Sequence, residues 1–248
     1  MRNYLSFGGG VNSVALHLHL IDLEIEFESI FVHHNTDWPE TYQYLELFQG
    51  WLEKNGYPPI TILIPDVEPT EKTEGFDDLY QYCLYKKIIP NYFRWCTDKF
   101  KLRTIYRYVK TPCFMMIGFD YDEQHRARIN HKNGVENRFP LIESEIGRKD
   151  CEKIIRDHGL PIPQKSGCFI CPFQKVKDFK ELRKRHPDLF CKATVLEDLV
   201  REHYNLQRGL NNKTPVFLKG NATLKSIIDE KQSKLWNDDE YPPCECML

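Results

Sequence analysis

Short apolar runs alternate with longer segments of helical periodicity over the first half of the chain. The apolar runs predict strands at Tyr4–Phe7, Glu26–His33, Ile60–Ile64 and Cys113–Gly118. Between them, apolar residues recur at helical spacing from Val14 to Ile21 and from Pro39 to about Asn55, where Pro39 occupies a favoured first-turn position. Because strands and helices alternate, we predict an α/β fold with a doubly wound, mainly parallel sheet. Such sheets bind ligands at the carboxyl ends of their strands.

The pattern changes near residue 160. Breakers at Gly159–Pro163 precede the cysteine motif Gly167-Cys168-Phe169-Ile170-Cys171-Pro172, and helical stretches follow around Lys175–Arg185 and Asp188–Tyr204. We therefore predict two parts. Residues 1–159 form a nucleotide-binding α/β domain, and residues 160–248 form a small cysteine-bearing helical region with a mobile tail.

Composition narrows the class of protein. The chain has 248 residues, 41% of them hydrophobic and 28% charged, with a net charge of −2, so no overall basic field attracts nucleic acid. The first residues lead directly into a strand, and the longest apolar run is too short to cross a membrane. We expect a cytoplasmic protein with no membrane partner. Nine cysteines without an export signal favour metal or redox roles over disulfides.

The segment Gly8–Ser13 is the first candidate site. It follows the first strand and opens a helix, so its glycines and the helix dipole can bind an anion. Asn12 and Ser13 lie in the first turn, where their side chains can cap the helix or contact a phosphate. The segment lacks the Gly-Lys-Ser/Thr ending of a Walker loop and the glycine spacing of a Rossmann fold. A plain strand-to-helix turn is the alternative.

This loop resembles the pyrophosphate loop of the ATP pyrophosphatase and PAPS reductase superfamily, usually Ser-Gly-Gly-x-Asp-Ser. Here Gly8 and Asn12 stand in place of Ser and Asp, while Ser6-Phe7-Gly8 is similar to the Ser-Phe-Gly of sulfonucleotide reductases. Further motifs follow in the family's order, at Thr36–Thr41, at Gly118–Arg128 and at Phe139–Ile142. The resemblance implies a five-stranded adenine nucleotide alpha-hydrolase-like sheet.

The same resemblance implies the nucleotide site. Together with the local basic segment Arg94–Lys110, it predicts that an adenine nucleotide (ATP, adenylyl sulfate or PAPS) contacts Ser6, Gly8, Gly9, Gly10, Asn12, Ser13, Asn35, Asp37, Lys99 and Gly118. In the loop after the fourth strand, Glu123 is predicted to position Mg²⁺ and Arg126 to face phosphate. Asp120 stands where the family often has Arg. We expect His33 and His34 to have packing or supporting roles.

The cysteines form the second candidate site. Cys168 and Cys171 have the C-x-x-C spacing that brings two thiolates to one metal. Adenylylsulfate reductases carry a similar motif, and a cysteine pair that Trp95-Cys96 resembles. The resemblance implies that Cys96, Cys168 and Cys171 hold an iron–sulfur cluster of four irons with one iron open. Zinc, with a fourth ligand such as His186 or Cys191, is the rival, and buried free thiols are the third interpretation.

These features lead to three functional hypotheses. The first is ATP-dependent adenylation of an acceptor followed by sulfur transfer, with a sulfur donor and a nucleic acid or nucleobase acceptor as partners. The second is a sulfonucleotide reductase that uses a thioredoxin-type reductant. In that enzyme Cys246 would be the nucleophile, since Glu245-Cys246 is similar to the Glu-Cys-Gly ending of the reductases. The third is a noncatalytic zinc-knuckle protein that binds nucleic acid.

Overall fold

The computed structural model describes residues 1–69, 74–91, 93–128, 134–164, 166–208, 215–217 and 223–227. Five strands form its sheet: β1 (Arg2–Ser6), β2 (Glu28–Val32), β3 (Thr61–Leu63), β4 (Cys113–Ile117) and β5 (Val135–Arg138). The α-helices are α1 (Val11–Asp22), α2 (Pro39–Lys54), α3 (Leu79–Lys86), α4 (Arg103–Tyr108), α5 (Pro140–Glu143), α6 (Arg148–Asp157), α7 (Val176–Arg185) and α8 (Pro187–Arg208). Three other helical segments are η1 (Thr97–Leu102), η2 (Tyr121–Arg126) and η5 (Leu224–Ile227).

All strand pairs in the sheet are parallel, in the order β3-β2-β1-β4-β5. Tyr4 of β1 lies opposite Glu28 of β2 and Met115 of β4. The chain therefore leaves β1 toward one edge and later returns to the other side of β1. This makes the β1–β4 boundary the topological switch point, where ligands of open α/β sheets bind. The predicted α/β class with a parallel five-stranded sheet is confirmed.

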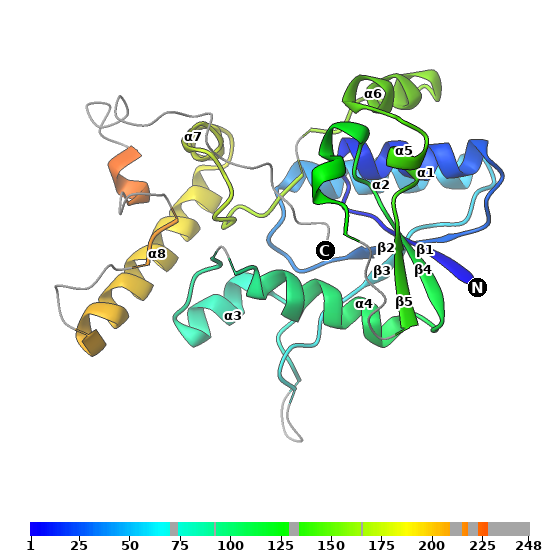
Figure 1. Cartoon of the computed structure of the whole chain (residues 1–248). Helices are drawn as coiled ribbons and strands as arrows, with labels where there is room; N and C mark the ends of the chain where they lie inside the picture. The colour runs from blue at the N-terminus through cyan, green and yellow to red at the C-terminus, as the bar shows by residue number, and fades with distance from the viewer. Residues whose placement is uncertain are drawn as a thin grey trace.

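Helices cover both faces of the sheet (Figure 1). On one face Leu5 and Phe31 pack against residues of α1, α2 and α6, including Leu16 and Ile155. On the other face Tyr4, Ile30 and Ile117 pack with Ile105 of α4. Adjacent residues of β1 thus enter opposite cores, as the two-residue period of a strand requires. Both faces of the sheet are covered in this way. A ligand site can therefore form at the carboxyl ends of the strands.

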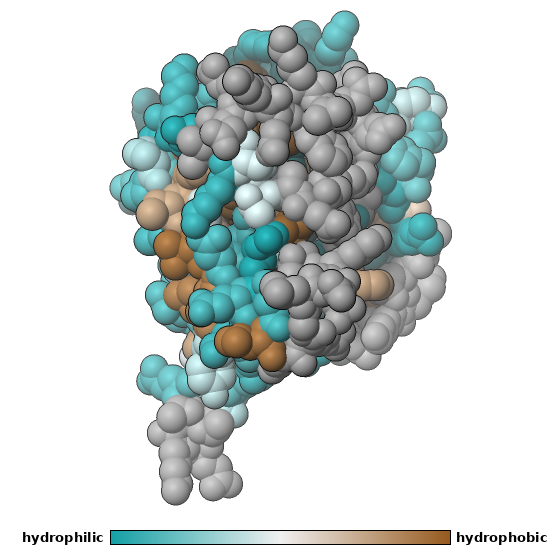
Figure 2. All heavy atoms as spheres, turned by 90° about the vertical axis from the view of Figure 1, so that its left-hand side faces the viewer, coloured by the Kyte–Doolittle hydropathy of each residue, from teal (hydrophilic) through white to brown (hydrophobic). Residues whose placement is uncertain are grey.

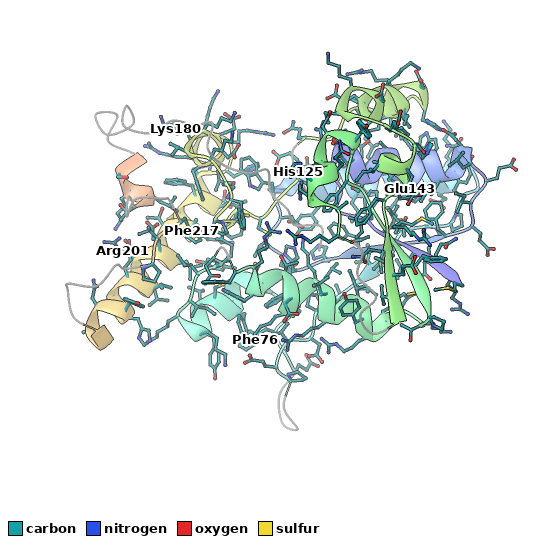
Figure 3. All side chains as sticks on the ribbon, viewed as in Figure 1. Phe76, His125, Glu143, Lys180, Arg201 and Phe217 are labelled. Atoms are coloured by element: carbon teal, nitrogen blue, oxygen red, sulfur yellow. The ribbon has the colours of Figure 1, made fainter. Side chains whose placement is uncertain are left out.

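A third core lies beside the sheet and joins α3, the cysteine motif, α7 and α8. It includes Tyr82, Phe100 and Leu196, and Phe217 packs against Phe179 of α7 (Figure 3). Figure 2 views the molecule from the α7–α8 end, where hydrophilic residues surround separate brown hydrophobic ones in the part not drawn in grey. Val195 of α8 is such an exposed residue. Isolated exposed hydrophobics of this kind are ordinary on protein surfaces.

Several elements have no counterpart among those that the hydrophobic pattern predicts, besides the short segments α5 and η5. They are α3, α6 and the edge strand β5, which are short or strongly charged, so their apolar residues leave little periodicity. The predicted basic helix is present, but its first turn, η1, is a π-helix, a rare form often associated with functional sites. Among the described residues, no helix combines the length and the hydropathy needed to cross a membrane.

Candidate functional site

The glycine loop lies at the switch point, between the end of β1 and the start of α1. Gly9 has a φ of +71°, a left-handed conformation that favours glycine, and Gly10 is the N-cap of α1. Gly10 provides no side-chain cap, so the first N–H groups of α1 are directed out of the helix with the positive end of its dipole. The loop therefore has the backbone geometry of an anion site.

Two neighbouring segments enclose this loop. A Cβ atom at Gly9 would lie 3.0 Å from Cγ2 of Thr41, in the first turn of α2, and one at Gly10 would lie 2.7 Å from Oγ of Ser166. The predicted loop residue Ser6 is buried, and Ser13 donates its hydroxyl to the carbonyl of Gly10 at 2.9 Å. Ser13 thus helps to hold the turn closed, and its contact with a phosphate stays a prediction.

Asn12 connects the loop after β1 to the loop after β4. Its amide nitrogen donates to Asp120 at 2.9 Å and to Glu123 at 2.9 Å, and its amide oxygen accepts from Arg148 of α6 at 3.1 Å. Asn12 and Asp120 are both buried. The two carboxylates therefore converge on one amide beside the glycine loop.

The loop after β4 is packed tightly against the start of α1. A Cβ atom at Gly118 would lie 3.0 Å from backbone atoms of Asn12 and Ser13, so only glycine fits without displacement. In η2, Arg126 forms an ion pair with Glu123 and lies 4.4 Å from the centre of the Phe119 ring. Figure 3 shows His125 on η2 and Glu143 on α5 on the same side of the sheet as α1. Both predicted catalytic residues of this loop, Glu123 and Arg126, thus belong to the network of Asn12.

The segment after β2 brings three potential metal ligands together. His34 Nε2 lies 3.5 Å from Asp37 Oδ2, and Cys168 Sγ lies 3.5 Å from Asp37 Oδ1 and 3.9 Å from His34 Nε2. All three residues are buried. Asn35 has a positive φ of 61° and an exposed side chain, and so it turns the chain between His34 and Asp37. The sequence predicts only a packing or supporting role for His34.

Tyr42 of α2 borders the same cluster. Its hydroxyl accepts a hydrogen bond from the Asp37 backbone N–H at 3.1 Å. Burial raises the pKa of Tyr42 above its ordinary value, and the negative charges of Asp37 and Cys168 raise it further, while Lys101 lowers it. The positive charge of Lys101 therefore reaches this part of the site.

The predicted cysteine ligands share a cavity. Cys96, Cys168 and Cys171 line a space of about 20 Å³, roughly the room that one water molecule needs. A cluster of four irons and four sulfides is larger than this space, so it would require the cavity to open. A single ion fits the space as it stands. The iron–sulfur cluster stays a prediction.

Lys99 and Cys246 are the remaining residues that the sequence predicts for the site. Lys99 forms an ion pair with Glu68 at 2.6 Å and a hydrogen bond with the Tyr82 hydroxyl at 2.9 Å, and its predicted nucleotide contact stays a prediction. Hydrogen bonds from Lys86, Lys99 and Tyr82 lower the pKa of Glu68 to about 2. Cys246 lies outside the described residues. Arg148 was missed because it comes from α6, a helix that the hydrophobic pattern does not reveal.

Comparison with known proteins gives likenesses among solved structures only. No protein-family model matches the chain, and no curated protein matches it. Among solved structures, a phosphoadenylyl-sulfate (PAPS) reductase from Candida auris in a phosphate complex matches with a TM-score of 0.46 and 13% sequence identity. The match covers 68% of this chain and 81% of that chain. The chain is similar in structure to that reductase.

Proposed function

We propose that the chain is an ATP-dependent enzyme that adenylates an acceptor oxygen and replaces it with sulfur. The observation that supports this most is the convergence of Asp120 and Glu123 on Asn12 beside the glycine loop. Two carboxylates next to a phosphate site repel a free anion, but they suit a nucleotide that brings Mg²⁺. Oxygen atoms of carboxylates are the ligands that Mg²⁺ prefers.

The acids also favour ATP over a sulfonucleotide. Adenylyl sulfate and PAPS are anions whose reduction by a thiol requires no divalent cation. In a triphosphate complex, Mg²⁺ bound by Asp120 and Glu123 would neutralise phosphate charge, while Arg126 pairs with Glu123 and Arg148 donates to Asn12. The glycine loop would bind phosphate oxygens through its N–H groups.

A second cavity provides a place for the acceptor. It measures about 140 Å³ and is lined by Trp38, Ser166, Cys171, Gln174 and Arg185 among others. An aromatic ring beside amide and guanidinium groups suits a planar heterocycle such as a nucleobase. Ser166 connects this cavity to the glycine loop, and Cys171 lines both this cavity and the cysteine cavity.

In the proposed reaction, cysteine thiols carry the sulfur that replaces the acceptor oxygen. The acceptor oxygen attacks the α-phosphorus of ATP, and pyrophosphate leaves. The terminal sulfur of a cysteine persulfide then attacks the activated carbon, and AMP leaves with the oxygen. A second thiol attacks the remaining S–S bond, which releases the thiolated product and leaves a disulfide for a thioredoxin-type dithiol to reduce. Cys96 and Cys171, which line one cavity, are the proposed carrier and resolving thiols.

Nucleotide binding tests the proposal. Calorimetry should show that MgATP binds at least about tenfold more tightly than ATP with a chelator, and more tightly than adenylyl sulfate or PAPS. Asp120→Asn and Glu123→Gln should each weaken MgATP binding, because each removes a charge that holds the cation. Glu143→Gln, which changes an exposed acid at the end of α5, is the matched control and should bind like the wild type. Metal-independent, tighter binding of PAPS or adenylyl sulfate would contradict the proposal.

A further inference from the structure

His34, Asp37 and Cys168 have the donor atoms of a transition-metal site. An imidazole nitrogen, a carboxylate oxygen and a thiolate sulfur are the three ligand types that zinc takes in proteins. The three atoms lie within 4.8 Å of one another, and all three residues are buried. Among the described residues, no other group of three or more His, Cys, Asp or Glu side chains has its ligand atoms this close together.

The separation of His34 from Asp37 matches two ligands of one ion better than it matches a direct hydrogen bond, and both sulfur contacts are short enough for Cys168 to join them. With bonds of about 2.0–2.1 Å to nitrogen or oxygen and about 2.3 Å to sulfur, tetrahedral ligand atoms lie roughly 3.3–3.6 Å apart. His34 Nε2 lies 3.5 Å from Oδ2 of Asp37, while Cys168 Sγ lies 3.5 Å from the other carboxylate oxygen, Oδ1, and 3.9 Å from His34 Nε2. A charge-assisted N–H···O hydrogen bond would be about 2.7–2.9 Å long. The distance between His34 and Asp37 is therefore that expected for two ligands of the same metal ion.

The backbone holds these side chains in place. Asp37 and Cys168 form an antiparallel bridge, in which the Phe169 N–H donates to the Thr36 carbonyl at 2.9 Å and the Trp38 N–H donates to the Gly167 carbonyl at 3.0 Å. The cysteine motif is thereby fixed to the segment after β2. The site is assembled by secondary-structure contacts between segments that are distant in sequence.

A supporting hydrogen bond orients the imidazole. His34 Nδ1 lies 2.8 Å from the Thr36 hydroxyl oxygen. When Nδ1–H donates to that hydroxyl, Nε2 keeps its lone pair, and Nε2 is the nitrogen that faces Asp37 and Cys168. Metal-binding histidines commonly have such a partner on the second nitrogen.

We propose that His34, Asp37 and Cys168 bind one divalent transition-metal ion, of which zinc is the best match to the donor set. The fourth position is open to a water molecule or to a substrate atom, as in zinc sites with three protein ligands. This site shares Cys168 with the predicted iron–sulfur cluster but uses neither Cys96 nor Cys171.

The metal content of the purified full chain tests the proposal, and its readout does not depend on nucleotide binding or turnover. We expect about one zinc per chain. Replacement by Co²⁺ should give thiolate-to-cobalt charge-transfer absorption together with the visible bands of a tetrahedral site. His34→Gln, Asp37→Asn and Cys168→Ser should each lower Zn²⁺ affinity at least about 100-fold. Thr36→Val should lower it about 10- to 100-fold, because it removes the orienting partner.

Two cysteine variants complete the experiment. Cys96→Ser should retain the zinc and the cobalt spectrum, and so should Cys191→Ser, which changes an exposed thiol on α8. Circular dichroism and competition with a chelator are measured on every variant, so that loss of metal is scored only on folded protein. About four irons per chain, lost in Cys96→Ser but kept in His34→Gln, would overturn the proposal. Folded wild-type protein that fails to bind added Zn²⁺ or Co²⁺ would also overturn it.

Discussion

Asn12 shows how one residue can decide the character of the site. The pyrophosphate loops that this segment resembles in sequence usually carry Asp at this position, and there the loop itself supplies a carboxylate. In this chain the acids come from the loop after β4, and the Asn12 amide donates to both Asp120 and Glu123. A neutral donor between two acids relieves their repulsion, whereas a third carboxylate would increase it.

Asn12→Asp should therefore destabilise the chain in the absence of divalent cations. The substitution removes two hydrogen bonds to charged groups and adds a buried negative charge, which together cost roughly 3 kcal/mol or more. Mg²⁺ should restore much of this loss, because three carboxylates then surround a cation. Thermal unfolding with and without Mg²⁺ measures the effect.

Asn55→Asp is the matched control, since Asn55 is exposed at the end of α2 and its amide donates to the Trp51 carbonyl. We expect it to cost less than about 1 kcal/mol, the scale of an unfavourable charge at a helix C-terminus, with no response to Mg²⁺. If both variants lose the same stability and neither responds to Mg²⁺, the two acids do not form a cation site.

At the residue scale, sequence motifs located the loop, but they could not reveal through-space partners. A strand–turn–helix pattern predicts Gly9, whereas Gly118 is predicted from its place at a strand end and from the family resemblance, and the structure shows close approaches at both. His34 could have been found from its place at a strand end three residues before Asp37. Its contact with Cys168 depends on a bridge across more than a hundred residues, and no local pattern reports such a bridge.

At the scale of elements, the contact of α1 with β2 contains a buried histidine. His17 packs among the rings of Phe7, Phe27 and Phe48, and its Nδ1 lies 2.8 Å from the Ser29 hydroxyl. Burial lowers the pKa of His17 from 6.5 to about 3. The folded chain therefore holds His17 neutral, while the unfolded chain takes up a proton at a higher pH.

This shift predicts a pH dependence of stability. The contribution of His17 is fully present above pH 6.5 and is lost as the pH falls toward about 3. His17→Gln cannot titrate, so its free energy of unfolding should depend less on pH in this window, by up to about 1.4 kcal/mol per pH unit. Ser29→Ala keeps the titrating ring and should keep the wild-type slope. Urea unfolding at several pH values gives the slopes, and equal slopes for wild type and His17→Gln would contradict the prediction.

Some strands and helices could be predicted from the sequence, and others could not. The strands β1, β2 and β4 lie within a few residues of their predicted bounds, because each contains a short buried apolar run. The edge strand β5 has the sequence Val-Glu-Asn-Arg, and only two of its residues are buried. Helix α6 is rich in charge, and its buried face is limited to Cys151 and Ile155. Such elements are stabilised by tertiary contacts that their own sequence does not show.

At the scale of the whole molecule, the third core crosses the predicted boundary at residue 159. Residues before it, such as Tyr82 and Phe100, pack with residues after it, such as Phe179 and Leu196. The Tyr80 hydroxyl of α3 also donates to the Lys192 carbonyl of α8 at 3.1 Å. The two predicted parts therefore share one apolar core in this structure, while the boundary itself stays a prediction.

A chain that ends at residue 159 should consequently be unstable. It would expose the large buried side chains of α3 and η1, and the lost burial of each is worth about 1.5–3 kcal/mol. We expect the full chain to unfold in one calorimetric transition and the shortened chain to lack a cooperative transition. A shortened chain with the melting temperature of the full chain would show that residues 1–159 fold independently.

The tail separates the two enzymatic hypotheses. A sulfonucleotide reductase needs a thiolate that attacks the sulfur of its substrate, and Cys246 is the residue that the family resemblance assigns to this step. An ATP-dependent sulfurtransferase activates the acceptor oxygen at the glycine loop, where Asp120 and Glu123 disfavour an anion that arrives without a cation. Removal of residues 244–248 should therefore leave MgATP binding unchanged, and the wild type should release no sulfite from adenylyl sulfate or PAPS. Cys191→Ser is the control for an exposed thiol. Sulfite release by the wild type that disappears in Cys246→Ser would instead establish the reductase.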